Sequence, residues 1–341
     1  MNISFVPLSP TLYPAFYALV QSTQWGNPML PVGYNDSLWG ILVQDSSGAI
    51  VGGWVGTLRG NAPLVRCIAK SVYFDSYPIF CSPEDEAQYL PRLVEAVKQY
   101  ARRQHIVMLN LTHWVRGCEL PIDILSKEAT FCIPLHDSTE QLWKLVESKQ
   151  RNCIRKGEKN GVEVDICQGE DSLRYLSDFQ RLRQSTQQHA IRNHTNASML
   201  LKSDDFFSEK FADPKATLFV ARVEGQTAAV ALMLQSGKTV YYYSGGSDYE
   251  LNRKYSCSAY LLWRAICHYN DLGLDMFDMG GVPQSPTAEH PAYGVYVFKR
   301  SFGGAYQEFD GGKIIISPTK YRLLNFLLSQ RKLLRLFSKR L

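Results

Sequence analysis

Runs of apolar residues separated by short polar turns predict two β-hairpins, one in each half of the chain. Turn residues between two apolar runs of this kind are typical of hairpins. The four predicted strands are residues 38–43 and 49–56 in the first hairpin, and residues 217–223 and 227–234 in the second. A further apolar run, residues 239–244, predicts a third strand directly after the second hairpin.

A helix and then an apolar strand follow each set of strands. Apolar residues recur at spacings of three and four over residues 84–103, which is the pattern of an amphipathic helix. A second helix is predicted over 256–272, where Ser256 or Ser258 would cap the N-terminus and Gly273 the C-terminus. The strands predicted after these helices are residues 106–111 and 274–279.

This repeated order of elements predicts two tandem α/β domains of the α+β type. The 341 residues suit two domains of about 150 to 170 residues each. We predict a mixed, largely antiparallel sheet in each domain. The predicted helices would cover this sheet, since a layer of strands must bury its apolar face. The expected divisions are residues 1–138, residues 139–318 and a C-terminal helix over residues 319–341. A helical pattern over residues 139–160 would join the two domains.

The composition predicts a folded protein without a membrane span or a metal site. Hydrophobic residues make up 45% of the chain and charged residues 20%, as in ordinary globular proteins. No apolar run approaches the roughly 18 to 20 residues that cross a bilayer, and residues 1–17 lack a secretory signal pattern. We therefore expect a cytoplasmic protein. The eight cysteines and seven histidines are dispersed without metal-ligand spacing, so we assign no metal.

Positive charge is concentrated at the C-terminus. Residues 313–341 contain eight lysines or arginines and no acidic residue, which leaves 29 basic against 32 acidic residues elsewhere. On a helical wheel the apolar residues of 321–341 lie opposite several of these cations. A basic amphipathic helix of this kind binds at an anionic membrane surface. The alternative is a terminal helix that packs on its own domain.

The segment 277–312 contains the least ordinary residue pattern. A predicted strand ends in F-D-M-G-G, and glycines at a strand end let backbone amides approach a ligand closely. Gly280 and Gly281 are therefore candidate binding residues. The alternative is a simple turn, with Asp278 as its cap.

Lys299 follows in the run Y-G-V-Y-V-F-K-R-S-F-G-G, which covers residues 293–304. We place it at a strand edge between Phe298 and Phe302, and we include Tyr296 with these two aromatics as candidate substrate contacts. A lysine in such a place is otherwise simply solvated.

Two further groups are candidates for substrate contact. Arg151, Arg155 and Lys159 recur every four residues and so share one helix face, where they repel each other by a few tenths of a kcal/mol per pair. This indicates an anionic partner such as a phosphate; the alternative is a solvated face. Tyr242 and Tyr243 lie in a strand whose side chains alternate between core and groove, so one or both would reach the substrate.

Three separate motifs resemble those of the FemAB-type transferases, a branch of the GNAT-like acyltransferases. They are R-x-x-I-R-K-x-x-K-x-G-V-x-V at 151–164, F-D-x-G-G at 277–281, and G-x-Y-x-F-K-x-x-F-G-G at 294–304. The resemblance covers most of the chain and is clearest over residues 139–312. It implies a pair of GNAT-like domains and transfer of an aminoacyl or acyl group onto an amine. In FemAB relatives the donor is aminoacyl-tRNA and the acceptor a muramyl peptide.

The chain departs from these relatives at two points. CoA-binding GNAT enzymes have a Q/R-x-x-G-x-G/A turn that holds the pyrophosphate at a helix N-terminus. The corresponding segments here read F-C-S-P-E-D and N-R-K-Y-S-C-S, which argues against acetyl-CoA. The long heptad-patterned arm of some Fem ligases is also absent from the sequence, so no arm-mediated grip on tRNA is expected.

These observations lead to one leading hypothesis and two alternatives. The leading one is a transferase for an amine acceptor of cell-envelope type, phosphate- or nucleotide-linked. Lys299 would supply positive charge near the carbonyl or a phosphate, and Asp278 would act as base or orient the loop. The donor stays open between aminoacyl-tRNA and acyl-CoA, with no tightly bound cofactor. The alternatives are a CoA-dependent N-acyltransferase of polysaccharide or small-molecule biosynthesis, and a non-catalytic module that binds phosphorylated glycans or RNA.

Overall fold

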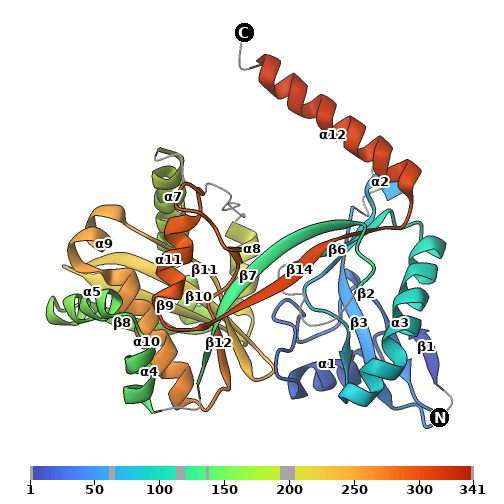
Figure 1. Ribbon diagram of the computed structural model, residues 1–341, viewed down its shortest axis with the longest axis horizontal. Helices are drawn as coiled ribbons and strands as arrows, with labels where there is room; N and C mark the ends of the chain where they lie inside the picture. The colour runs from blue at the N-terminus through green and yellow to red at the C-terminus, as the bar shows by residue number, and fades with distance from the viewer. Residues whose placement is uncertain (1–2, 61–65, 113–119, 136–137, 193–203, 339–341) are drawn as a thin grey trace. The chain divides into compact units, whose positions relative to one another are not determined.

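The chain folds into two compact units. The computed structural model describes residues 3–60, 66–112, 120–135, 138–192 and 204–338 (Figure 1). Unit 1 combines residues 1–127 with residues 309–341, and unit 2 consists of residues 128–308. The division falls within two long strands, β7 (Ile124–Pro134) and β14 (Ala305–Ile315), each of which runs through both units. The boundaries between the units thus lie inside strands, after residues 127 and 308, whereas the sequence led us to expect them at residues 138 and 318.

Unit 1 contains the first predicted hairpin and its helix. Its sheet has the order β1-β2-β3-β4-β6-β14. The pairs β1/β2, β2/β3, β3/β4 and β6/β14 are antiparallel, and β4 and β6 are parallel. Its strands are β1 (Ser4–Pro7), β2 (Leu38–Gln44), β3 (Ile50–Arg59), β4 (Ser71–Phe74), the short β5 (Ile79–Phe80) and β6 (Met108–Leu111).

The helices of unit 1 cover this sheet and extend from it. They are α1 (Tyr13–Ser22), α2 (Arg66–Ala69), α3 (Pro83–Arg103) and α12 (Pro318–Ser338). The predicted helix α3 packs against β2 and β3, and Ser82 caps it by accepting the Asp85 backbone N–H at 3.1 Å (Figure 1). Two hydrophobic clusters fill the core, one under α3 and one under α1.

Unit 2 repeats the plan of unit 1. Its sheet has the order β7-β12-β11-β10-β9-β8, in which β11 and β12 are parallel and all the other assigned pairs are antiparallel. The strands are β8 (Glu163–Cys167), β9 (Ala216–Val223), β10 (Gln226–Ser236), β11 (Thr239–Ser247), β12 (Met276–Asp278) and the short β13 (Val282–Pro283). In both units a helix links two parallel strands, α3 between β4 and β6 and α10 (Cys257–Asp271) between β11 and β12. The predicted pair of mixed, largely antiparallel sheets is confirmed.

Helices cover both faces of the sheet in unit 2. This coverage buries all the residues 216–221 of β9, whose side chains alternate between the two faces. Besides α10, these helices are α4 (Thr139–Leu145), α5 (Ser148–Lys159), α6 (Glu170–Leu173), α7 (Leu176–Arg192), α8 (Asp204–Ala212), α9 (Tyr249–Tyr255) and α11 (Tyr293–Arg300). Gly157 lets α5 approach α10, since a Cβ there would lie 2.7 Å from the Tyr260 Cβ. None of the helices within the described ranges is long and apolar enough to cross a membrane.

Two local predictions are corrected. The single helix expected over 139–160 is broken into α4 and α5, because Val146 and Glu147 adopt extended backbone conformations between them. Lys299 does not lie at the strand edge that was predicted for it. Residues 293–300 form α11 instead, and Tyr296 packs against Phe131, a tertiary contact that overrides the strand preference of V-Y-V-F.

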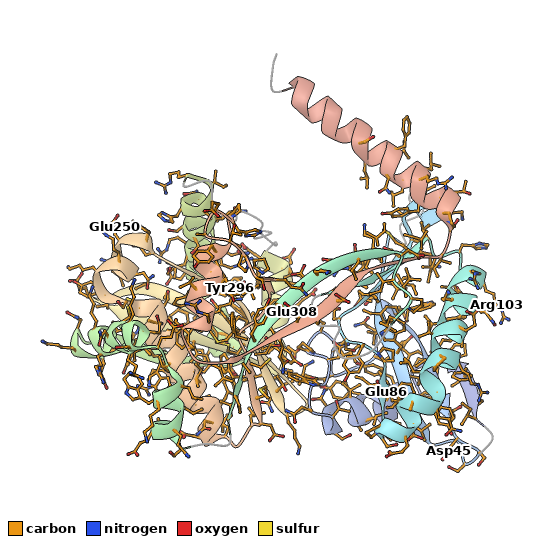
Figure 2. All side chains as sticks on the ribbon, in the orientation of Figure 1. Asp45, Glu86, Arg103, Glu250, Tyr296 and Glu308 are labelled. Carbon is orange, nitrogen blue, oxygen red and sulfur yellow. The ribbon has the colours of Figure 1, made fainter. Side chains whose placement is uncertain are left out.

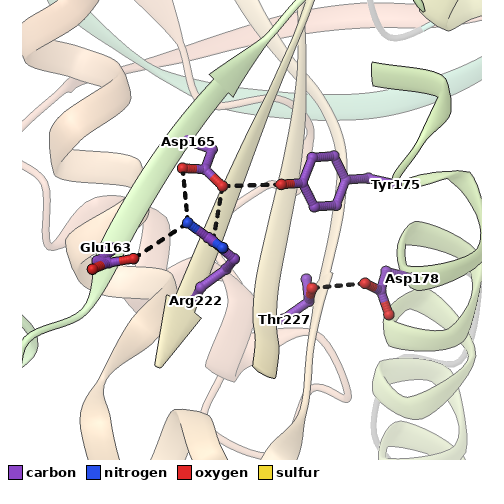
Figure 3. Close-up of polar contacts among 6 residues, drawn as sticks. All are labelled: Glu163, Asp165, Tyr175, Asp178, Arg222 and Thr227. Carbon is purple, nitrogen blue, oxygen red and sulfur yellow. Dashed lines mark hydrogen bonds and ion pairs between the residues drawn. The ribbon is translucent and has the colours of Figure 1, made fainter. Parts of the chain in front are cut away.

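Charged residues protect the edge strand β8 of unit 2 (Figure 3). Arg222 of β9 lies between Glu163 and Asp165 of β8, at 3.3 and 2.8 Å, and Tyr175 donates a hydrogen bond to Asp165 at 3.0 Å. Charged side chains on an edge strand disfavour pairing with another chain. This cluster therefore has a structural explanation and needs no catalytic one.

Candidate active site

Lys299 lies near the end of α11, with its amino group directed into unit 2. The Nζ atom donates a hydrogen bond to the carbonyl oxygen of Gly281 at 3.1 Å and lies 5.6 Å from the ring centroid of Tyr242. Burial lowers the pKa of Lys299 from its ordinary 10.5 to about 8. No carboxylate of the described residues contributes to this pKa. The site therefore holds a cation that is easily neutralised.

Gly280 and Gly281 form a tight loop under this lysine. Gly280 has a φ of +76°, a conformation that glycine adopts without steric cost. A Cβ at this position would lie 2.7 Å from the Tyr242 carbonyl oxygen and 3.3 Å from the Lys299 Nζ. The glycine is therefore required because strand β11 and the lysine approach it closely.

Asp278 at the end of β12 holds the loop in place. Its side chain is fully buried, and its Oδ1 accepts hydrogen bonds from the Thr130 hydroxyl at 2.5 Å and the Gly280 N–H at 2.8 Å. A general base must come within hydrogen-bonding reach of the substrate proton. The fully buried carboxylate fits the predicted orienting role better than the predicted role as a base. Thr130, which lies 148 residues away in sequence, gave no signal in the sequence.

The tyrosines of β11 lie beside a β-bulge. Pairing between β10 and β11 passes from Leu232 opposite Ser244 to Met233 opposite Tyr242, so Tyr243 is the extra residue. Bulges of this kind redirect side chains next to active sites. Tyr242 is held close to Lys299, and burial raises the pKa of its phenol to about 12. The phenol is therefore a hydrogen-bond donor at neutral pH.

Arg183 of α7 is a second cation near these tyrosines, and sequence reasoning missed it. Its side chain is 3% exposed; Nε donates to the Ser244 hydroxyl at 3.0 Å, and the guanidinium lies 4.5 Å from the Phe207 ring centroid. Burial lowers the pKa of Arg183, and the phenols of Tyr242 and Tyr243 partly oppose that shift. No spacing rule distinguishes it from its neighbour Arg181, so only the fold reveals it.

The three candidate basic residues of α5 make different contacts. Arg151 donates to the Val146 carbonyl oxygen at 2.7 Å, and so satisfies the C-terminal end of α4. Arg155 lies over the Trp143 ring at 5.3 Å, and Lys159 is exposed. The structure gives no contact between these three residues and Lys299, so phosphate binding by them stays a prediction.

The aromatic residues around Lys299 fall into two groups. Phe302 is buried in the core of unit 2 and packs edge-on against Phe298 at 5.4 Å, so it supports α11 from below. Tyr296 and Phe298 are only partly buried. These two keep the exposure that a substrate contact requires. The described residues contain no group of three or more histidine, cysteine or acidic side chains that could hold a metal ion.

Comparison with known proteins identifies the class of this fold and site. Residues 147–300 match the family model described as Acetyltransferase (GNAT) domain. No curated protein matches the sequence. FemX superposes with a TM-score of 0.67 at 15% identity, over 94% of this chain and 99% of that one. The C-terminal domain of a putative lysylphosphatidylglycerol synthetase from Agrobacterium fabrum gives 0.55 at 12% identity, over 93% and 95%.

A tandem GNAT protein from the clavulanic acid biosynthesis pathway gives a TM-score of 0.50 at 12% identity, over 93% of this chain and 99% of that one. The chain thus carries a GNAT acetyltransferase domain within unit 2, and the fold of the whole chain is that of FemX and of a tandem GNAT protein. Residues 147–300 therefore carry an acyltransferase domain of the GNAT type, and the fold of the chain is similar to that of FemX, in agreement with the resemblance of the three motifs.

The lowered pKa of Lys299 predicts how the stability of the protein depends on pH. Between pH 8 and 10.5 the unfolded chain binds more protons at this lysine than the folded one, so the free energy of unfolding rises over that range. Below pH 8 the buried charge destabilises the fold. Lys299→Met should therefore raise the free energy of unfolding at pH 7 by roughly 1 to 3 kcal/mol, and this gain should fade towards pH 10.

Urea denaturation at pH 7 and pH 10 measures both quantities. Lys149→Met, which changes an exposed lysine of α5, is the matched control and should show no such gain. A Lys299→Met variant that is less stable than the parent at pH 7 would contradict the assignment of a buried, destabilising cation.

Proposed function

We propose that the protein transfers an aminoacyl or acyl group onto an amine acceptor, with Lys299 stabilising the negative charge that develops during transfer. The observation that carries this proposal is the partly buried Lys299 amino group over the Gly280–Gly281 loop, inside a GNAT domain. The amine nitrogen attacks the acyl carbonyl carbon, the new C–N bond forms, and the bond from that carbon to the donor's oxygen or sulfur breaks. The amine loses a proton, and the leaving group gains one.

Lys299 and Tyr242 suit the electrostatic requirements of this step. A pKa of about 8 leaves Lys299 mostly protonated at pH 7, while the phenol of Tyr242 keeps its proton up to about pH 12. Both groups can donate a hydrogen bond to the carbonyl oxygen or to the leaving group as negative charge accumulates. Donors that are fixed in a site of low dielectric are the usual source of the largest rate effects.

The N-terminus of α10 favours an aminoacyl ester over a CoA thioester as donor. CoA-binding GNAT enzymes place the pyrophosphate on free backbone amides at this helix N-terminus. Here the Ser258 N–H donates to the Asn252 side-chain oxygen at 2.8 Å, and Ser256 joins α9 directly to α10 with a φ of +59°. A side chain of the protein thus already accepts a hydrogen bond from a backbone amide in the first turn of α10. Aminoacyl-tRNA is therefore the proposed donor, and a phosphate- or nucleotide-linked cell-envelope precursor the proposed acceptor, in the cytoplasm.

A CoA-dependent N-acyltransferase is the second candidate, because the matching family model describes an acetyltransferase domain. Native mass spectrometry of the protein with aminoacyl-tRNA, acyl-CoA and a UDP-muramyl peptide compares the donors directly. We expect complexes with aminoacyl-tRNA and the peptide and none with acyl-CoA. A complex with acyl-CoA alone would favour the second candidate. Binding of tRNA or glycan without any turnover would favour a non-catalytic module.

Removal of the lysine charge tests the proposed role of Lys299. Lys299→Met should reduce turnover by about a hundredfold or more, as the loss of one charge-stabilising donor does in other acyl transfers. Lys299→Arg should keep part of the activity and should remove the fall in rate that we expect for the parent above pH 8. Rates of amide formation across pH 6 to 10 give both results, with Lys149→Met as control. Full activity in Lys299→Met would overturn the role.

The C-terminal helix α12 is proposed to contact an anionic membrane surface. Its start packs beside α2, yet four of its apolar side chains are 42 to 58% exposed, namely Leu323, Phe326, Leu327 and Leu328. The eight basic residues of 313–341, without any acidic residue, complement anionic lipid headgroups.

Co-sedimentation with vesicles tests this contact. The parent should bind vesicles that contain phosphatidylglycerol and should bind pure phosphatidylcholine vesicles weakly. Phe326→Glu together with Leu327→Glu should abolish the sedimentation. Leu272→Glu, which changes an equally exposed leucine outside α12, should leave it unchanged. Sedimentation that survives the double change in α12 would remove the proposal.

A further inference from the structure

Helix α11 presents an aromatic surface that its own unit does not bury. None of its side chains is fully buried, and Val295 is 46% exposed. Tyr293 and Tyr296 are partly buried, and their rings are nearly parallel, with 17° between the planes and 6.3 Å between the centroids. A short helix that positions Lys299 thus carries two stacked, partly exposed tyrosines one turn further towards its N-terminus.

Neighbouring elements of unit 2 hold these rings in place. Tyr296 packs edge-on against Phe131 of β7 at 5.2 Å and against Tyr306 of β14 at 6.1 Å. The Tyr306 hydroxyl accepts the backbone N–H of Ser285 at 3.0 Å. Ser285 has a φ of +39°, which is unusual for a residue other than glycine and is kept only where the surroundings enforce it. The aromatic cluster is therefore fixed before any ligand arrives.

A carboxylate lies at the edge of this cluster. Glu308 follows Tyr306 by two residues on β14, so both side chains lie on the same face of the strand. The Tyr306 hydroxyl lies 3.2 Å from the Glu308 Oε1 and donates to it, while the carboxylate itself is exposed. Figure 2 labels Glu308 together with Tyr296. Arg300, one helical turn after Tyr296 on α11, forms an ion pair with Glu147 at 3.1 Å.

We propose that Tyr293, Tyr296 and Glu308 bind the ammonium group of a primary alkyl amine, the acceptor of the transfer reaction. The ammonium group gives one proton to solvent before its nitrogen attacks the acyl carbon, and a second proton passes to the leaving group as the amide forms. Aromatic faces attract cations, and a carboxylate beside them supplies the opposite charge. Tyr296 and Lys299 are three residues apart on α11, so their Cβ atoms lie about 5 to 6 Å apart. An amine bound at the tyrosines is thus within one helical turn of the group that acts on the acyl carbonyl. This inference rests on the proposed transfer to an amine and names the class of that amine.

The groups around α11 favour charges of opposite sign. Lys299 extends towards the Gly280–Gly281 loop, where it favours negative charge on the acyl donor. Tyr296 of α11, with Tyr306 and Glu308 of β14, favours positive charge. Donor and acceptor would therefore bind through groups of opposite character about one helical turn apart.

Binding of a simple amine tests the site without any turnover. The probe is hexylamine at pH 7, where it is an ammonium ion, and the comparison ligand is neutral hexanol. Ligand-observed NMR titration should give an affinity for hexylamine about three- to tenfold higher than for hexanol. Glu308→Gln and Tyr306→Phe, which removes the hydroxyl that holds Glu308, should each abolish this preference. Asp310→Asn changes the same charge two residues further along β14 and should leave it intact.

Equal affinity of the parent for hexylamine and hexanol would overturn the proposal, as would an unchanged preference in Glu308→Gln. Stronger binding of a neutral methyl glycoside than of hexylamine would also overturn it, since that result identifies a sugar platform. With the true acceptor, Glu308→Gln should raise KM several-fold and leave kcat unchanged. Failure of the transfer proposal is distinguishable, because full activity in Lys299→Met leaves the amine titration unaffected.

Discussion

The active site depends on the hydrogen bonds of one buried carboxylate. Asp278 has no access to water, so its oxygen atoms must be satisfied within the protein. Thr130 from β7 and the Gly280 N–H donate to its Oδ1, which ties the end of β12 to a neighbouring strand. This connection fixes the Gly281 carbonyl that receives Lys299. The position of the Lys299 amino group thus depends on a buried carboxylate that it does not itself contact.

The two units share one order of elements, but the loop at the end of β12 has a different set of hydrogen bonds from the corresponding end of unit 1. In unit 1 the parallel strands β4 and β6 end at the corresponding place, but the Thr112 hydroxyl there donates to Asp75 at 3.2 Å. Asn27 donates to the Ser76 hydroxyl at 3.1 Å and Trp54 to the Ser76 carbonyl at 2.9 Å, so the polar groups at this end bond to one another. The sequence motifs F-D-x-G-G and F-K-x-x-F-G-G, which form the candidate site at the end of β12, occur only among the residues of unit 2.

Local patterns predicted the elements whose structure depends on local interactions. Both hairpins, α3 and α10 follow from periodicity and turn residues, and Gly273 has the positive φ expected after a helix. The prediction of a strand edge at Lys299 was wrong because β-branched and aromatic residues favour strands only in a suitable context, and here Tyr296 packs on Phe131 from a helix. Thr130, Arg183 and Glu308 gave no signal, because the fold brings them to the site from distant segments. Lys299, Gly280 and Tyr242 were candidates from the sequence because they belong to motifs or aromatic runs, and the structure brings them close together.

The energetics of the site explain why it needs a rigid surrounding. Burial lowers the pKa of both Lys299 and Arg183, so each cation opposes folding while it remains charged. Such groups persist only where nearby packing leaves no alternative position. Phe302 beneath α11 and the phenylalanines around Arg183 provide that packing. A relaxed site would expose both cations to water, and the pKa of Lys299 would then return towards its ordinary value. Under the proposed function, this loss of stability keeps a charged group in place before the acyl donor binds.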